Sequence, residues 1–410
     1  MLVYSLRAAA FAAAILPALA AAAPMSLEQA LQLAVQRSEG ARASRASAES
    51  ARQLIQPAGE LPDPMLSLGI ENMPVAGPNR LSLSRDDMTM KRIGLAQEWV
   101  SGEKRSLRRA AAAATVDREL VAAGGVLAEA RMQTAQAYLD AYYAGEALRL
   151  TVQNERHAGE EFEAAKALLR STTGSSREVL ALAAGRGRAE DESAETRQQQ
   201  RAALVALQRW VGPGADELQK PAIPEPLPET SFVDLHPLVT ARKREVEVAR
   251  REAAVTAANR KPNWTWEVAY GHRSGAPDML SVGVSIPLPV APGARQDRET
   301  AARLALAEKA EAELAEAVRS AEGEYRALRS DATRLQERID RYRDGVLVLS
   351  QQRTAAALAA YRSNQASLAM LFEARHAELE AQRKLLALNR DLAKVQAQLA
   401  FKPLNTRELP

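Results

Sequence analysis

Hydrophobic and polar positions recur along this chain with two periods, which predict helices and strands. Long segments place an apolar residue at every third or fourth position, the pattern of α-helices that bury one face. They run over 27–56, 102–170, 176–211, 238–260, 293–361 and 367–400. Pro62 and Pro262 end two of them, because proline lacks the N–H that would continue a helix.

Four short segments alternate with a period of two residues, which predicts half-buried β-strands over 65–72, 92–100, 264–270 and 280–288. Their apolar face, which we expect to contact lipid, comprises Leu66, Leu68, Ile70, Ile93, Leu95, Trp264, Trp266, Val268, Val282, Val284 and Ile286. The opposite face, which carries Ser67, Glu98, Thr265, Glu267, Ser281 and Ser285, predicts a water-filled lumen, because a packed core would be apolar there.

The same order of elements occurs twice, and this predicts an internal duplication. We expect a signal peptide at 1–20, a first repeat at 21–211 and a second repeat at 233–402. A proline-rich linker at 212–232 separates the repeats, and 403–410 form a tail. Each repeat reads as helix, strand pair, long helix, turn and helix.

The first residues have the features of an export signal. Arg7 precedes an apolar run over 8–16, and Ala18-Leu19-Ala20 has the small residues of a cleavage site. We therefore expect export from the cytoplasm of a Gram-negative cell. No later run reaches the ~18 apolar residues that a spanning helix needs, so membrane entry would require the strands.

Composition excludes several classes of function. The 410 residues include no cysteine, so thiolate metal sites and disulfides are excluded. The 54 basic and 51 acidic residues form no block of one sign, which argues against a nucleic-acid partner. None of the 4 histidines pairs with another at metal-ligand spacing, and no nucleophile or phosphate-binding motif occurs. The sequence thus predicts no enzyme activity, no catalytic residue, no metal site and no cofactor.

The strand number and helix lengths constrain the assembly. Four strands cannot close a barrel, and open edges are not tolerated in lipid, so several chains must contribute to one barrel. A helix over 102–170 is about 100 Å long at 1.5 Å per residue. Such long polar helices must pack side by side in coiled-coil fashion to be stable.

Several segments resemble the TolC-type outer-membrane efflux proteins. The resemblance covers nearly the whole chain after the signal peptide. The segments are SLEQALQLAVQRSEG (26–40), LPDPMLSLGIEN (61–72), SGEKRSLRRA (101–110) and HPLVTARKREVEVARREA (236–253). The first strand pair looks most similar to the heavy-metal branch of that family (CzcC/CusC-like).

The resemblance implies a mainly helical fold with a small membrane β part. It implies a homotrimer in the outer membrane, with four strands per chain in a twelve-stranded barrel above a periplasmic helical barrel and an equatorial linker. Such a protein is the exit duct of a tripartite pump, and its partners are a periplasmic adaptor (membrane fusion protein) and an inner-membrane RND-type transporter. The cargo of the heavy-metal branch is metal cations.

The resemblance also places adaptor contacts at the helix turns. The corresponding residues here are Leu169, Arg170, Gly174, Tyr361, Arg362 and Asn364. Members with an aspartate constriction carry acidic residues near the second turn, but this chain has none between Arg362 and Leu371. Two alternatives stay open: a duct for drug efflux or type I protein secretion, and a periplasmic coiled-coil scaffold.

Overall fold

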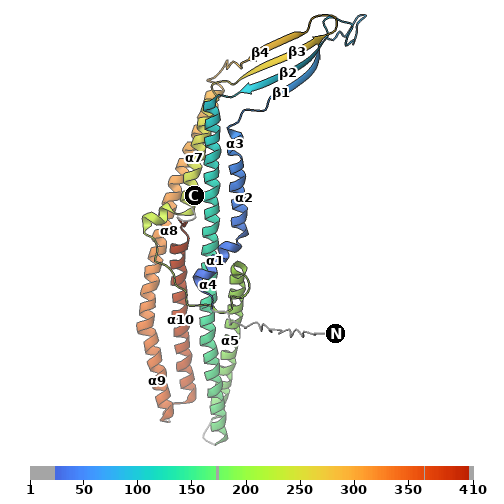
Figure 1. The fold of residues 1–410 in the computed structure, drawn as a ribbon. Coiled ribbons are helices and arrows are strands. Elements are labelled where there is room, and N and C mark those ends of the chain that lie inside the picture. The colour runs from blue at the N-terminus through green and yellow to red at the C-terminus, as the bar shows by residue number, and fades with distance from the viewer. Residues whose placement is uncertain (1–23, 172–174, 364, 406–410) are drawn as a thin grey trace, which may run out of the picture.

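An elongated bundle of helices carries a sheet at one end (Figure 1). This computed structural model describes residues 24–171, 175–363 and 365–405. The predicted signal peptide therefore lies outside the described residues. Among them, no helix is both long and apolar enough to cross a membrane.

The sheet contains the four predicted strands. They are β1 (Met65–Glu71), β2 (Met90–Trp99), β3 (Trp264–Arg273) and β4 (Met279–Ser285). All neighbours are antiparallel, in the order β1-β2-β3-β4. The strand positions are confirmed within about three residues. β4 ends before the predicted 288, where Pro287 and Pro289 lack the N–H that a strand ladder needs.

The long helices of the first half have the predicted limits. α4 (Gly102–Arg170) begins after Ser101, whose hydroxyl accepts a hydrogen bond from the N–H of Lys104. α5 (Ser176–Val211) ends at Gly212, where φ is 88° and glycine is favoured. Both ends follow from local capping chemistry that the sequence shows directly.

The expected helix over 27–56 consists of three shorter helices: α1 (Leu27–Arg37), α2 (Glu39–Gln53) and α3 (Ile55–Ala58). Ser38 is extended, and its side chain caps the start of α2 by accepting from Ala41 N at 3.1 Å. The expectation of one helix was wrong here, because serine competes well at such caps and the apolar period continues across the break.

The second half also differs in detail. α6 (Glu229–Asp234) and α7 (Pro237–Ala258) precede β3, and α10 (Leu368–Phe401) is the last helix. The expected helix over 293–361 begins later, as α8 (Gln296–Arg341), and continues through a π-helical turn, η1 (Tyr342–Leu347), into α9 (Val348–Arg362). A π turn adds one residue to a turn but does not end the helix, so a helical pattern continues through it.

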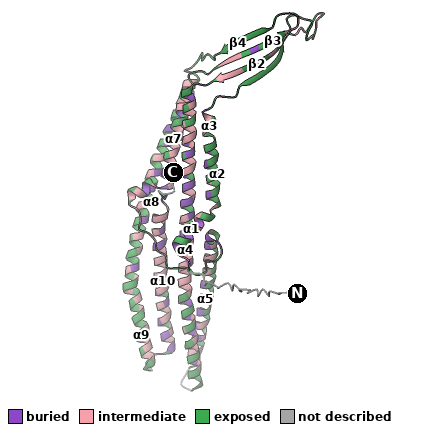
Figure 2. Cartoon of the chain, in the orientation of Figure 1, coloured by how far each residue is buried: buried purple, intermediate pink, exposed green. Residues whose placement is uncertain are grey.

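α4 is the central element of the bundle, since it contacts α1, α2, α3, α5, α7 and α10. Alanine is the most frequent of its buried residues, and such small side chains permit helices to approach closely. Much of the outer surface of the helices is exposed (Figure 2). The largest buried cluster lies midway along α4 and contains Tyr138, Leu139 and Leu207.

Non-helical chain crosses the bundle beside this cluster. Met25 forms a parallel β-bridge with Leu218, and the Tyr138 hydroxyl lies 2.7 Å from Met25 O and 2.8 Å from Gln219 O. Burial raises the pKa of Tyr138 to about 12, so the hydroxyl stays protonated as the donor to these carbonyls. One side chain therefore joins α4 to the segment before α1 and to the linker.

We predict that Tyr138→Phe lowers the free energy of unfolding by about 0.5–1.5 kcal/mol, because the hydrogen bonds from the hydroxyl to two part-buried carbonyl oxygens are lost while the ring packing is kept. Denaturant unfolding of the detergent-solubilised protein measures this. Unchanged stability, together with unchanged hydrogen exchange around Met25 and Gln219, would show that water replaces the hydroxyl at no cost.

Candidate functional site

The strand register collects the predicted apolar residues on one face of the sheet. One row across the four strands is Leu66, Leu95, Val268 and Val282, and the next is Leu68, Ile93, Tyr270 and Leu280. The side chains are strongly exposed, with Leu68 at 74% and Val282 at 73%. A contiguous exposed apolar face of this kind marks a surface that contacts a membrane or a protein partner.

The predicted lumen residues share the opposite face. Ser67 on β1 and Ser281 on β4 lie in one row across the sheet, and Glu98, Thr265 and Ser285 lie in another. Arg92 lies on this face between Glu71 and Glu267, with N···O distances of 2.7 and 2.6 Å. The sequence reasoning missed Arg92, although it has the same strand parity as Glu98. The polar face therefore carries paired charges that favour contact with water.

Small residues make room for these charged side chains. A Cβ on Gly94 would lie 2.6 Å from Ser67 Oγ and 3.3 Å from Glu267 Oε1. Any larger residue at this position would displace the serine or the carboxylate. Gly94 thus keeps the centre of the polar face close-packed between β1 and β3.

Both outer strands have one unpaired edge. Among the described residues, β1 pairs only with β2 and β4 pairs only with β3. The backbone N–H and C=O groups along these edges are free to pair with another strand. The sheet is therefore an incomplete unit.

A lysine ties the sheet to the helices. Lys104 is buried at the start of α4, and its ammonium donates to Asn263 Oδ1 at 2.7 Å and to the carbonyl of Lys261. Burial is the main cause that lowers the pKa of the Lys104 ammonium, because the charged form is less stable away from water. The contact joins the helix that follows β2 to the residues that enter β3.

The opposite end of the bundle carries the turns of two helical hairpins, α4/α5 and α9/α10. Leu169, Arg170 and Arg362 are exposed there, at the ends of α4 and α9. Tyr361 is half-buried against an apolar cluster that includes Leu182 and Leu368. Gly174 and Asn364, two further residues of the predicted adaptor contact, lie outside the described residues.

Two polar contacts join the hairpins near these turns. The carboxylate of Glu178 on α5 accepts from Leu368 N at 2.7 Å and so caps α10. Arg375 on α10 forms an ion pair with Glu161 on α4, whose side chain is only 5% exposed. Burial raises the pKa of the Glu161 carboxyl, and the Arg375 guanidinium opposes that shift. Neither contact was predicted, because the partners are far apart in sequence.

Known structures share this architecture. No protein-family model and no curated protein matches the chain. Solved structures do match. The outer-membrane channel OprN aligns with a TM-score of 0.74 at 17% identity, over 92% of this chain and 90% of that one. The outer-membrane protein VceC from Vibrio cholerae gives 0.73 at 17%, over 92% and 96%. CusC, described as forming a transmembrane channel, gives 0.74 at 14%, over 92% of each chain.

The chain has the fold of these outer-membrane channels. The predicted mainly helical class with a four-stranded antiparallel sheet is confirmed, and the neighbours are channel proteins rather than enzymes. In this channel fold, the sheet and the two hairpin turns are the opposite ends of one long body (Figure 1).

We predict that Arg375→Met destabilises the hairpin ends by about 3 kcal/mol, because it leaves the Glu161 carboxylate buried without its cation. Local hydrogen exchange at the start of α10 measures the loss. The double variant Glu161→Gln with Arg375→Met should recover most of it.

Arg319→Met is the matched control, since Arg319 forms an exposed ion pair with Glu316 on α8. It should change local stability by less than about 1 kcal/mol. Equal effects of Arg375→Met and Arg319→Met would contradict a structural role for the buried pair.

Proposed function

We propose that this chain is the outer-membrane exit duct of a tripartite efflux pump. The observation that carries the proposal is a sheet with an apolar face, a charged polar face and two unpaired edges, held at the end of helices about 100 Å long. The shared fold with outer-membrane channels supports it. In this proposal the apolar face contacts lipid and the polar face lines the lumen.

The strand lengths support membrane insertion. β2 and β3 have 10 residues each, which corresponds to about 33 Å. At a tilt of about 45° they would rise about 23 Å, close to the ~25 Å apolar band of outer-membrane barrels. Trp99 and Trp264 pair at the helix-proximal end with ring centroids 5.9 Å apart, where aromatic residues suit a membrane boundary.

Closure requires further copies of the chain. Barrels that span membranes have about eight strands or more, so one chain is insufficient and two copies reach only the minimum. The proposed homotrimer joins β1 of one copy to β4 of the next and satisfies every strand edge. The helices then form a periplasmic tube beneath the barrel.

The hairpin turns are the proposed docking end for a periplasmic adaptor that links the duct to an RND-type inner-membrane transporter. Arg170 and Arg362 occupy equivalent helix ends and are exposed. Their charges are also favourable beside the negative ends of the helix dipoles. Leu169 and Tyr361 add apolar surface next to them.

We propose metal cations as the cargo, on the resemblance of residues 62–72 and 88–99 to the heavy-metal branch. CusC is among the structural neighbours, but its identity of 14% is no higher than that of OprN or VceC. The fold similarity therefore does not add to this assignment. Drug efflux is the competing outcome.

Deletion of the gene tests the function. The duct proposal expects the protein in detergent-extracted outer membrane and expects increased sensitivity of the deletion strain to zinc, cobalt, cadmium, copper or silver. Release of the protein by osmotic shock would instead support a periplasmic scaffold. Lost tolerance to antibiotics and detergents with unchanged metal tolerance would replace the metal cargo by organic compounds.

We predict that Val282→Arg impairs membrane assembly, because an arginine on the lipid face near the midplane costs about 2–4 kcal/mol. Ser281→Arg on the opposite face is the matched control and should assemble normally. The yield of folded trimer in outer-membrane fractions measures both. Equal trimer yields for the two variants would contradict the assignment of the faces.

A further inference from the structure

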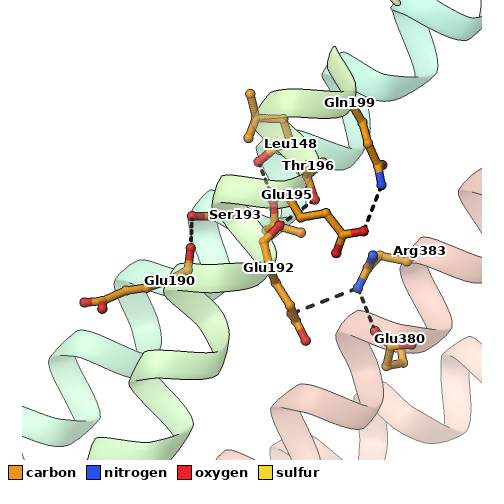
Figure 3. A network of polar contacts seen from close by, with 10 residues as sticks. Leu148, Glu190, Glu192, Ser193, Glu195, Thr196, Gln199, Glu380 and Arg383 are labelled. Carbon is orange, nitrogen blue, oxygen red and sulfur yellow. Dashed lines mark hydrogen bonds and ion pairs between the residues drawn. The ribbon is translucent and has the colours of Figure 1, made fainter. Parts of the chain in front are cut away.

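Three potential metal ligands meet between α5 and α10. One ligand atom each of Glu192, His376 and Glu380 lies within 4.8 Å of the others. His376 and Glu380 are four residues apart on α10 and so share a face, which Glu192 on α5 meets. Figure 3 shows the two carboxylates on either side of Arg383.

One carboxylate oxygen in this cluster lacks a hydrogen bond. Glu192 Oε2 is buried and has no hydrogen-bond partner among the described residues. Arg383 Nη1 approaches it only to 4.0 Å, because the same nitrogen is 3.0 Å from Glu380 Oε1. A buried anionic oxygen without a hydrogen bond is costly, and a cation bound beside it would remove that cost.

The imidazole is held in place by packing. The rings of His376 and Phe372 are stacked, with centroids 6.3 Å apart and planes 9° apart. Phe372 in turn lies against Gly185 of α5, where an added Cβ would be 2.7 Å from Phe372 Cζ. The glycine thus admits the phenyl ring that orients the histidine, a support that metal ligands commonly have.

We propose that Glu192, His376 and Glu380 bind a divalent transition-metal ion that bridges α5 and α10. One imidazole nitrogen and two carboxylates are a ligand set that suits Zn²⁺, Co²⁺ or Ni²⁺ rather than Cu⁺. Bond lengths of about 2.0–2.2 Å require ligand atoms roughly 3.4 Å apart, so small side-chain rotations from the observed 4.8 Å limit complete the site. Water would fill the remaining coordination positions.

Arg383 competes with the ion in this proposal. Its guanidinium pairs with both carboxylates of the site, so a bound dication must displace it. Arg383 is partly exposed and can turn toward solvent. Removal of this cation should therefore strengthen metal binding, whereas a simple ion-pair network would gain nothing from its loss.

The position of the ion gives it a structural consequence. His376 lies eight residues, or about 12 Å, from the start of α10, and the ion would fasten the α4/α5 hairpin to the α9/α10 hairpin. This consequence rests on the proposed function, in which these hairpin ends form the periplasmic end of the duct. Metal binding itself does not depend on it.

The test uses the full chain, purified in detergent without a polyhistidine tag, and titrates it with Zn²⁺ by calorimetry and with Co²⁺ by absorption. We expect one strong Zn²⁺ site per chain. His376→Gln and Glu380→Gln should each weaken it at least about tenfold, which is the range seen even for supporting residues of metal sites. Arg383→Gln should strengthen it several-fold.

His157→Gln is the matched control, because His157 also lies beside a glutamate, with 3.3 Å between Nδ1 and Glu160 Oε2, but belongs to no group of three metal ligands among the described residues. It should leave binding unchanged. Equal affinities of the His157 and His376 variants, no stoichiometric Zn²⁺ binding, or an Arg383→Gln variant that binds no tighter would each overturn the site. If His376→Gln does not fold, the exposed Glu380→Gln decides the question.

The two proposals fail separately. Zn²⁺ binding is measured on the isolated protein, whatever its cellular role. If the protein binds Zn²⁺ but is released from the cell by osmotic shock, the duct proposal is wrong and the metal-site proposal stands. If the protein supports normal efflux but binds no Zn²⁺, the metal-site proposal is wrong and the duct proposal stands.

Discussion

The unpaired edges of β1 and β4 are the constraint on which the rest of the structure depends. Backbone groups at a sheet edge must pair with water or with another strand, and lipid offers neither. A sheet with one apolar face is therefore stable in a bilayer only as part of a closed ring. In the proposed barrel, closure needs several copies held at a constant angle to each other, and helices attached directly to the strands would hold them so. The buried Lys104 makes this attachment where α4 begins.

The helical body obtains its rigidity from close approach rather than from large side chains. Alanine is the most frequent buried residue on α4, and each alanine removes little apolar surface from water. Larger contributions are concentrated at a few places, of which the cluster around Tyr138 is the main one. That cluster lies where Met25 and the linker cross α4, so the two halves of the chain are joined at the best-packed level of the bundle.

Local chemistry explains which parts could be predicted from the sequence. The limits of α4 and α5 follow from Ser101, Gly212 and the apolar period, and the strand faces follow from alternation. The break at Ser38 and the π turn at Tyr342–Leu347 were not predicted, because a helical pattern is present on both sides of each. Arg92 could have been assigned to the polar face of the sheet, because it has the same strand parity as Glu98. The pairs Glu161–Arg375 and Glu178–Leu368 and the Glu192–His376–Glu380 cluster depend on how distant helices align, which no local pattern specifies.

These distant polar contacts all join the α4/α5 hairpin to α10, at the end of the molecule away from the sheet. Between α5 and α10, the half-exposed Arg383–Glu192 pair at 4.0 Å contributes at most about 1 kcal/mol, which is less than the buried Glu161–Arg375 pair contributes. A metal ion bound by ligands from both helices would contribute more, since it binds the assembled pair and not the separated one. Contact between the hairpins would then depend on the metal concentration around them. In these two proposals, a cation would thus control one end of a body whose other end would be fixed by strand pairing.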